Sequence, residues 1–128
     1  MKLSSDITAI VTGGASGLGE GTARTLADHG VKDGIFDLNE ERGQKVADEI
    51  GGAFAKVNVA DNDSVDAGFD HIRAVLGQER IMVNCAGIGG GIKTVARKRD
   101  TGEIVPHDPA AFIRIININL IGSFLCAS

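Results

Sequence analysis

Strand-like apolar runs alternate with helical patterns along this 128-residue chain, and this alternation limits the folds open to it. Runs typical of buried strands occur at Ile7–Thr12, Val31–Leu38, Phe54–Val59 and Ile81–Asn84. Strands that alternate with helices pair in parallel through right-handed crossovers. The sequence therefore predicts an α/β fold, a doubly wound parallel sheet in three α/β/α layers with strand order 3-2-1-4. Only the N-terminal half of such a fold is expected, with the fourth strand left as an edge.

Capping residues mark where the helices should begin. Asn39 is expected to cap the helix after the second strand, and Asp108 the last helix, which has a proline in its first turn. Between the fourth strand and that last helix, Cys85–His107 is rich in glycine and basic residues and lacks a clear period. We expect a long irregular loop there.

Length and composition fit one domain, residues 1–128, with an apolar core. The 13 basic and 17 acidic residues give a net charge of −4 without a run of one sign, so no nucleic-acid partner is expected. No run approaches roughly 18 apolar residues, so no membrane span is expected either. Cys85 and Cys126 lack paired spacing, and the histidines lack metal-ligand spacing, so reduced thiols and no metal site are predicted. We expect a cytoplasmic protein, or alternatively one of an organelle matrix.

A glycine-rich turn lies between the first predicted strand and the first predicted helix. Gly13, Gly17 and Gly19 leave backbone N–H groups open at a helix N-terminus, where a pyrophosphate can bind. Their spacing is GxxxGxG, and the GxGxxG fingerprint is not met because Thr22 stands where its last glycine would be. The alternative is a turn whose glycines only allow strand and helix to pack closely.

Asp37 ends the second predicted strand, roughly 20 residues beyond the turn, where an acidic side chain accepts hydrogen bonds from an adenosine ribose. Its carboxylate would oppose a 2′-phosphate by at most about 4 kcal/mol for charges ~4 Å apart at an effective dielectric near 20. No Arg or Lys lies in Gly14–Leu18 or just after Asp37, so no nearby cation is expected to compensate. The sequence predicts NAD in preference to NADP.

Together, Thr12–Gly19, Asp37 and Asn84–Gly87 resemble the short-chain dehydrogenase/reductase family over nearly the whole chain. The resemblance implies a Rossmann-like fold, NAD as cofactor and a small-molecule alcohol or ketone as substrate. Within the family, TGGASGLG and NCAGI followed by Lys93-Thr94 look most like the type 2 3-hydroxyacyl-CoA dehydrogenases. The basic run Arg97–Arg99 is interpreted as solvated surface in preference to a contact with CoA.

The resemblance also assigns site residues, with one departure from the family pattern. Asn58-Val59 stands where the family has the Asp-Val pair that contacts adenine, so Asn58 takes the place of the acid, with Asp61 as the alternative. The implied cofactor-binding residues are Gly13, Ser16, Gly17, Leu18 and Gly19 in the turn, Asp37 and Leu38 after the second strand, Asn58 and Val59 after the third, and Asn84, Cys85, Ala86 and Gly87 after the fourth.

One catalytic role is implied in the last helix, where Asn119–Gly122 resembles the family's NxxG segment. The Asn of that segment holds a water in the proton relay to the catalytic lysine. Asn117 competes for the role, but a two-residue offset turns it about 200° around the helix, so only one of them can face the sheet. We choose Asn119.

The family's hydride chemistry rests on a serine and a Tyr-x-x-x-Lys motif, and this sequence contains no tyrosine. Ser128 is the last residue, and the serine role is not transferred to it. We therefore expect an NAD-dependent oxidoreductase as the parent and no turnover by the chain as given. A fragment is preferred over a catalytically empty nucleotide binder, and a SAM-dependent methyltransferase is the weaker alternative. The last helix lies in the family's usual subunit interface, so the intact form is expected to be a homo-oligomer.

Overall fold

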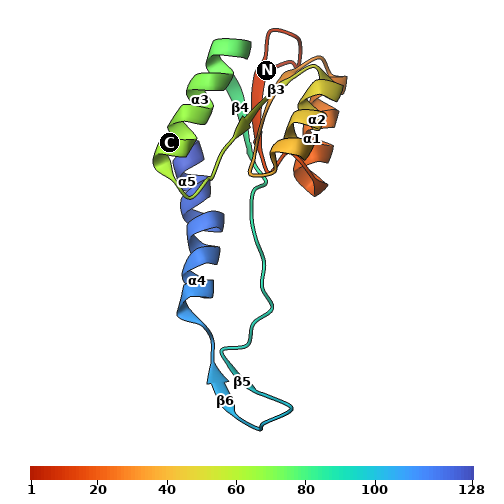
Figure 1. Cartoon of the computed structure of the whole chain (residues 1–128). Coiled ribbons are helices and arrows are strands. Elements are labelled where there is room, and N and C mark those ends of the chain that lie inside the picture. The colour runs from red at the N-terminus through yellow and green to blue at the C-terminus, as the bar shows by residue number, and fades with distance from the viewer.

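The computed structural model describes all residues from Met1 to Ser128 and contains a four-stranded parallel sheet. Its strand order is β3-β2-β1-β4, which confirms the predicted order and leaves β4 at one edge. Figure 1 shows helices on both faces of the sheet, as a doubly wound fold requires. The elements of this body are β1 (Thr8–Thr12), α1 (Gly17–Asp28), β2 (Lys32–Asp37), α2 (Glu40–Ile50), β3 (Ala53–Lys56), α3 (Asn62–Leu76) and β4 (Glu79–Asn84).

Apolar side chains fill the space on each side of the sheet. Towards α3, Phe36 packs edge-on against Phe69 with ring centroids 5.3 Å apart. Towards α1 and α2, the buried side chains of Val11, Ile35 and Val46 form a second cluster. Each such side chain stabilises the fold by roughly 1.5–3 kcal/mol through burial. The two clusters hold the carboxyl ends of the strands at one edge of the body.

The predicted caps are present at the helix N-termini. Asn39 accepts a hydrogen bond from the backbone N–H of Arg42, and Asp108 accepts one from that of Ala110. Such caps satisfy N–H groups that have no partner within the helix. They fix where α2 and the last helix begin.

An arm extends away from the body beyond β4 (Figure 1). It carries an antiparallel hairpin of β5 (Val95–Arg97) and β6 (Ile104–Pro106), so the expectation of an irregular loop throughout Cys85–His107 is wrong in this part. Gly102 adopts a φ of 72° at the tip, and Lys98 pairs with Glu103 across it at 2.8 Å. The chain then returns to the body through α4 (Pro109–Ile116), a π-helical segment η1 (Asn117–Ile121) and α5 (Gly122–Ala127).

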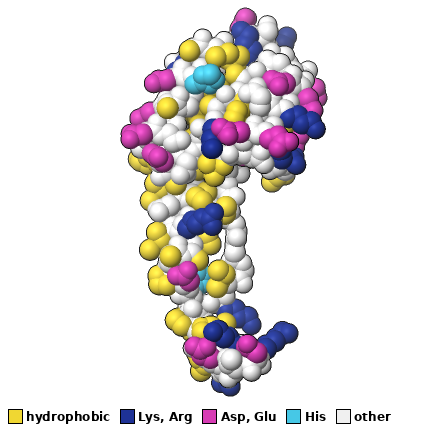
Figure 2. Space-filling model, in the orientation of Figure 1, with side chains coloured by type: hydrophobic (Ala, Val, Ile, Leu, Met, Phe, Trp, Pro, Cys, Tyr) yellow, Lys and Arg dark blue, Asp and Glu magenta, His cyan; other side chains and the backbone are white.

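This returning helix is apolar and mostly uncovered. The most apolar 18-residue window of Pro109–Ala127 has a mean hydropathy of 1.7, and 11% of that window is buried. By length and composition alone this helix is sufficient to cross a membrane, but core helices of soluble proteins pass the same test, so the expectation of no membrane span stays a prediction. The side chains of Phe112, Leu120 and Phe124 are 58%, 64% and 67% exposed. Figure 2 shows apolar side chains along this part of the molecule, a surface suited to a partner.

Candidate functional site

A cavity of about 420 Å³ lies at the carboxyl edge of the sheet, where β1, β2, β3 and β4 end. A larger hollow of about 720 Å³ lies beside the open edge of β4, between α3 and α5. We take the smaller cavity as the candidate site because it contains the glycine turn and almost every predicted cofactor residue. Of that set, Gly17 and Asn84 are not in its lining, and Asn84 borders the larger hollow instead. The lining includes Gly13, Ser16, Leu18, Gly19, Asp37, Leu38, Asn58, Val59, Cys85, Ala86 and Gly87.

Close packing explains two glycines of the turn but not the third. A Cβ on Gly19 would lie 2.1 Å from the carbonyl oxygen of Gly13, and one on Gly13 would lie 2.9 Å from the Cα of Ala86. A Cβ on Gly17 would meet nothing within 4 Å, so its φ of +55° is the reason for glycine there. Packing alone therefore does not account for the turn.

The start of α1 is open for an anion. Ser16 occupies the N-cap position, but its side chain makes no capping hydrogen bond. The N–H groups of the first turn have no acceptor within the helix and carry the positive end of its dipole. Leu18 beside them is 87% exposed, so the position is accessible to a ligand. This arrangement fits a pyrophosphate.

Asp37 connects the end of β2 to the glycine turn. Its Oδ2 accepts a hydrogen bond from the N–H of Ala15 at 3.1 Å, and its Oδ1 accepts one from that of Asn39 at 3.0 Å. Each carboxylate oxygen can accept a further hydrogen bond. Asp37 therefore has the capacity to bind ribose hydroxyl groups while it holds the turn in place.

A cation also reaches the turn, which corrects the expectation that none lies nearby. The Nε of Arg42 donates to the carbonyl oxygen of Ala15 at 3.0 Å, and its Nη2 lies 3.4 Å from a carboxylate oxygen of Glu20. Arg42 lies five positions after Asp37 in the first turn of α2, where its N–H donates to the side chain of the N-cap Asn39. Residues adjacent to the turn or to Asp37 in sequence give no signal of this approach.

Thr12 fixes the segment that follows β4. Its buried hydroxyl oxygen accepts hydrogen bonds from the N–H groups of Cys85 at 3.1 Å and Ala86 at 3.0 Å. These bonds bring the carboxyl ends of two neighbouring strands together and hold Ala86 and Gly87 against the turn. The sequence predicts no separate role for Thr12, because its hydrogen-bond partners are more than 70 positions away along the chain.

Between the two adenine candidates, the geometry favours Asn58. Asn58 lines the cavity, and its side-chain oxygen accepts a hydrogen bond from the N–H of Ala60 at 3.1 Å. Asp61 is not in the lining, because its carboxylate caps α3 through the N–H groups of Asp63 and Ser64. The cap gives Asp61 a structural function.

Asn119 faces the segment after β4, whereas the side chain of Asn117 forms no hydrogen bond with it. The amide of Asn119 accepts from the N–H of Ile88 at 2.9 Å and donates to its carbonyl oxygen at 2.8 Å. Asn119 lies in η1, and such π-helical turns are frequent at functional sites. Its proposed part in proton transfer stays a prediction.

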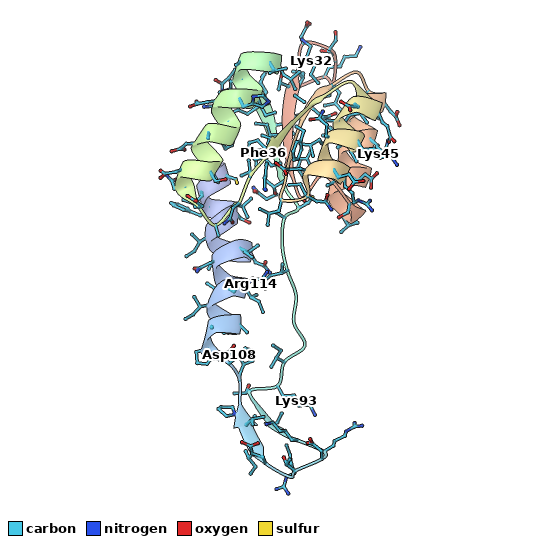
Figure 3. The ribbon with its side chains drawn as sticks, in the orientation of Figure 1. Lys32, Phe36, Lys45, Lys93, Asp108 and Arg114 are labelled. Atoms are coloured by element: carbon cyan, nitrogen blue, oxygen red, sulfur yellow. The ribbon has the colours of Figure 1, made fainter.

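Five further residues line the cavity that the sequence does not single out, namely Phe36, Val57, Ile88, Arg114 and Ile118. Figure 3 shows Arg114 extending from α4 towards the chain segment that follows β4. The sequence signal for Arg114 is its spacing of four residues from Ile118, which places both side chains on one helix face. No group of three or more His, Cys, Asp and Glu side chains is arranged to hold a metal ion.

Residues 7–128, which include every element of the site, match the model for short chain dehydrogenases. This chain belongs to the short-chain dehydrogenase family. The 3-hydroxyacyl-CoA dehydrogenase type-2 of Rattus norvegicus is 38% identical over 120 residues, 92% of this chain and 44% of that protein. The secoisolariciresinol dehydrogenase of Forsythia intermedia is 33% identical over 121 residues, 92% of this chain and 41% of that protein.

A solved structure of a reductase has a similar fold. A crystal structure of 3-ketoacyl-(acyl-carrier-protein) reductase from Brucella melitensis complexed with NADH has a TM-score of 0.81 and 30% identity. The match covers 94% of this chain and 47% of that one. The predicted family and the likeness to type 2 3-hydroxyacyl-CoA dehydrogenases are confirmed. The chain spans less than half the length of these relatives.

Proposed function

We propose that this chain supplies the NAD(H) site of a short-chain dehydrogenase that transfers a hydride between the nicotinamide ring and a secondary alcohol or ketone. The observation that carries the proposal is the cavity at the carboxyl edge of the sheet, where the glycine turn, Asp37 and the segment after β4 meet. The open first turn of α1 suits the pyrophosphate, and the lone pairs of Asp37 suit the ribose. The bound cofactor would accept or donate the hydride.

NAD is the proposed cofactor in preference to NADP. Asp37 supports this choice, since its carboxylate repels a 2′-phosphate. The Brucella reductase of similar fold is complexed with NADH. Arg42 acts in the opposite direction and reduces the expected preference, because its guanidinium lies at the same turn.

The substrate is proposed only as a class, with one specific candidate. The relative from Rattus norvegicus is named for 3-hydroxyacyl-CoA and the one from Forsythia intermedia for secoisolariciresinol, and both names describe dehydrogenases. A 3-hydroxyacyl-CoA is therefore the specific candidate within the class of secondary alcohols. The chain contains no tyrosine, so we propose that it binds the cofactor without turnover.

A second copy of the chain is the proposed partner of the exposed apolar helix. Its uncovered side chains, which include Phe112, Leu120 and Phe124, are typical of a surface that is buried on association. A homo-oligomer formed through α4 and α5 would remove them from water.

Two glycine variants test the proposed site against a purely structural turn. Gly17 and Gly51 have φ values of 55° and 68°, and an added Cβ would meet nothing within 4 Å at either. Gly17→Ala and Gly51→Ala should therefore lower the free energy of unfolding by a similar amount, about 1–2 kcal/mol. Only Gly17→Ala should also weaken NADH binding, by about tenfold, since it displaces the N–H groups that face the pyrophosphate.

The measurement is a fluorescence titration of NADH with each variant, alongside urea unfolding. Equal NADH affinity for the two variants would contradict the proposal. So would tighter binding of S-adenosylmethionine than of NADH by the unmodified chain, which would favour the methyltransferase alternative.

A further inference from the structure

Arg114 is the only positively charged side chain in the lining of the candidate cavity. Asp37 is the only negatively charged one, and the other lining residues are neutral. Arg114 is exposed, and its guanidinium forms no hydrogen bond or ion pair with any other residue. A ligand in the cavity would therefore meet a cation that the chain does not otherwise use.

The helix face that carries Arg114 lies over the end of β3. Ile118, four residues later on the same face, packs against the core cluster that contains Val57 and Val59. Arg114 is one turn further out from the sheet and lines the same cavity as Asn58 and Val59. The glycine turn and α1 lie towards the opposite face of the sheet (Figure 1). Arg114 is thus near the proposed adenine position.

Contacts on two sides hold this helix in place. Asn119 makes two hydrogen bonds with the backbone of Ile88, which also lines the cavity. Gly122 is packed so closely that a Cβ there would lie 2.8 Å from Cγ2 of Val59. These contacts anchor the helix five and eight residues beyond Arg114, and the long Arg114 side chain is free to adjust to a ligand.

We propose that Arg114 holds the adenosine half of the bound dinucleotide, with its guanidinium plane against the adenine ring. This inference rests on the proposed NAD(H) site. Guanidinium groups stack on aromatic planes more readily than ammonium groups, because they are planar and weakly hydrated. Arg114 acts as a positioning residue that closes the side of the cavity opposite the glycine turn.

The test compares Arg114→Gln with Arg99→Gln, which each remove one positive charge. Arg114→Gln should weaken binding of both NADH and AMP by about five- to tenfold, the loss typical of a cation–π contact on a desolvated ring. It should leave binding of nicotinamide mononucleotide, which has no adenine, unchanged. Arg99→Gln, in the hairpin and outside the cavity, should change none of the three affinities. Arg114→Lys should restore only part of the loss, because the charge returns without the plane.

The possible outcomes separate this inference from the proposed function. If the unmodified chain binds no NADH, the proposed function fails and the inference fails with it. If it binds NADH and Arg114→Gln matches Arg99→Gln, only the inference is overturned. A full restoration by Arg114→Lys, or an equal loss for nicotinamide mononucleotide, would also overturn it, since a charge contact to phosphate would then suffice. Circular dichroism of each variant establishes that the fold is retained.

Discussion

A buried acid in β2 should make the stability of this chain fall as the pH rises. Asp33 is 1% exposed, and neither of its carboxylate oxygens has a hydrogen-bond partner. Burial raises the pKa of this carboxyl from 3.8 to about 7, because the charged form loses its hydration. The strand position would suit an apolar side chain, and the acid there costs stability once it ionises.

The sign and size follow from proton binding. The unfolded chain releases this proton near pH 3.8, whereas the folded chain retains it until about pH 7. Between these values the folded state binds one more proton, so its stability falls by about 1.4 kcal/mol per pH unit. The total loss is about 4 kcal/mol, and it is complete above about pH 7. Below about pH 4 the carboxyl of Asp33 is protonated in both states, and none of this stability is lost.

Urea unfolding between pH 4.5 and 8, followed by circular dichroism, measures the effect. Asp33→Asn removes the titration but keeps the shape, so the free energy of unfolding of the original chain should fall relative to that of the variant as pH rises. Asp28→Asn removes one negative charge at an exposed position and serves as the control. If the original chain and Asp33→Asn show parallel pH profiles, the reasoning about Asp33 is refuted.

Three further changes probe the turn, the segment after β4 and the apolar helix. Asp37→Ala should lower the ratio of the NADPH to the NADH dissociation constant by about tenfold. Adding Arg42→Gln should then weaken NADPH binding again, because the cation near the turn is lost. An unchanged ratio in fluorescence titrations would count against the repulsion of a 2′-phosphate by Asp37 and its attraction by Arg42. Thr12→Val leaves the N–H of Ala86 without its acceptor, whereas the N–H of Cys85 keeps the backbone carbonyl oxygen of residue 12. The variant should lower the free energy of unfolding in urea by about 1–3 kcal/mol, and no loss would mean that the hydroxyl bonds are dispensable. Leu120→Lys should reduce self-association measured by sedimentation velocity. Val95→Lys, at a similarly exposed position in the hairpin, should not. Equal effects of the two variants would mean that the contact between copies does not form through the apolar helix.

The strands, their order and the helix starts were predictable because their signals are local. Alternating apolar runs, the caps at Asn39 and Asp108, and the glycines after β1 each act within a few residues. Parallel order then follows from crossover rules that hold for most such chains. The candidate cofactor residues were predictable because they follow directly after these strands.

What could not be predicted depends on distant contacts or on weak local patterns. Arg42 reaches the glycine turn, and Arg114 lines the cavity, only because α2 and α4 lie where they do in the fold. The β5–β6 hairpin has strands of three residues, too short for a period to stand out. The widened helical turn at Asn119 has no recognised sequence signal. Tertiary packing decided each of these features.

The most direct test of the central claim is a map of where NADH binds, obtained from backbone amide shifts in a nitrogen-15 NMR titration. We predict that the largest shifts occur at Gly13, Leu18, Ala86 and Gly87, which line the cavity at the carboxyl edge of the sheet. Shifts confined to the larger hollow beside β4, for example at Asp70, or no shifts at NADH concentrations that saturate related dehydrogenases, would contradict it.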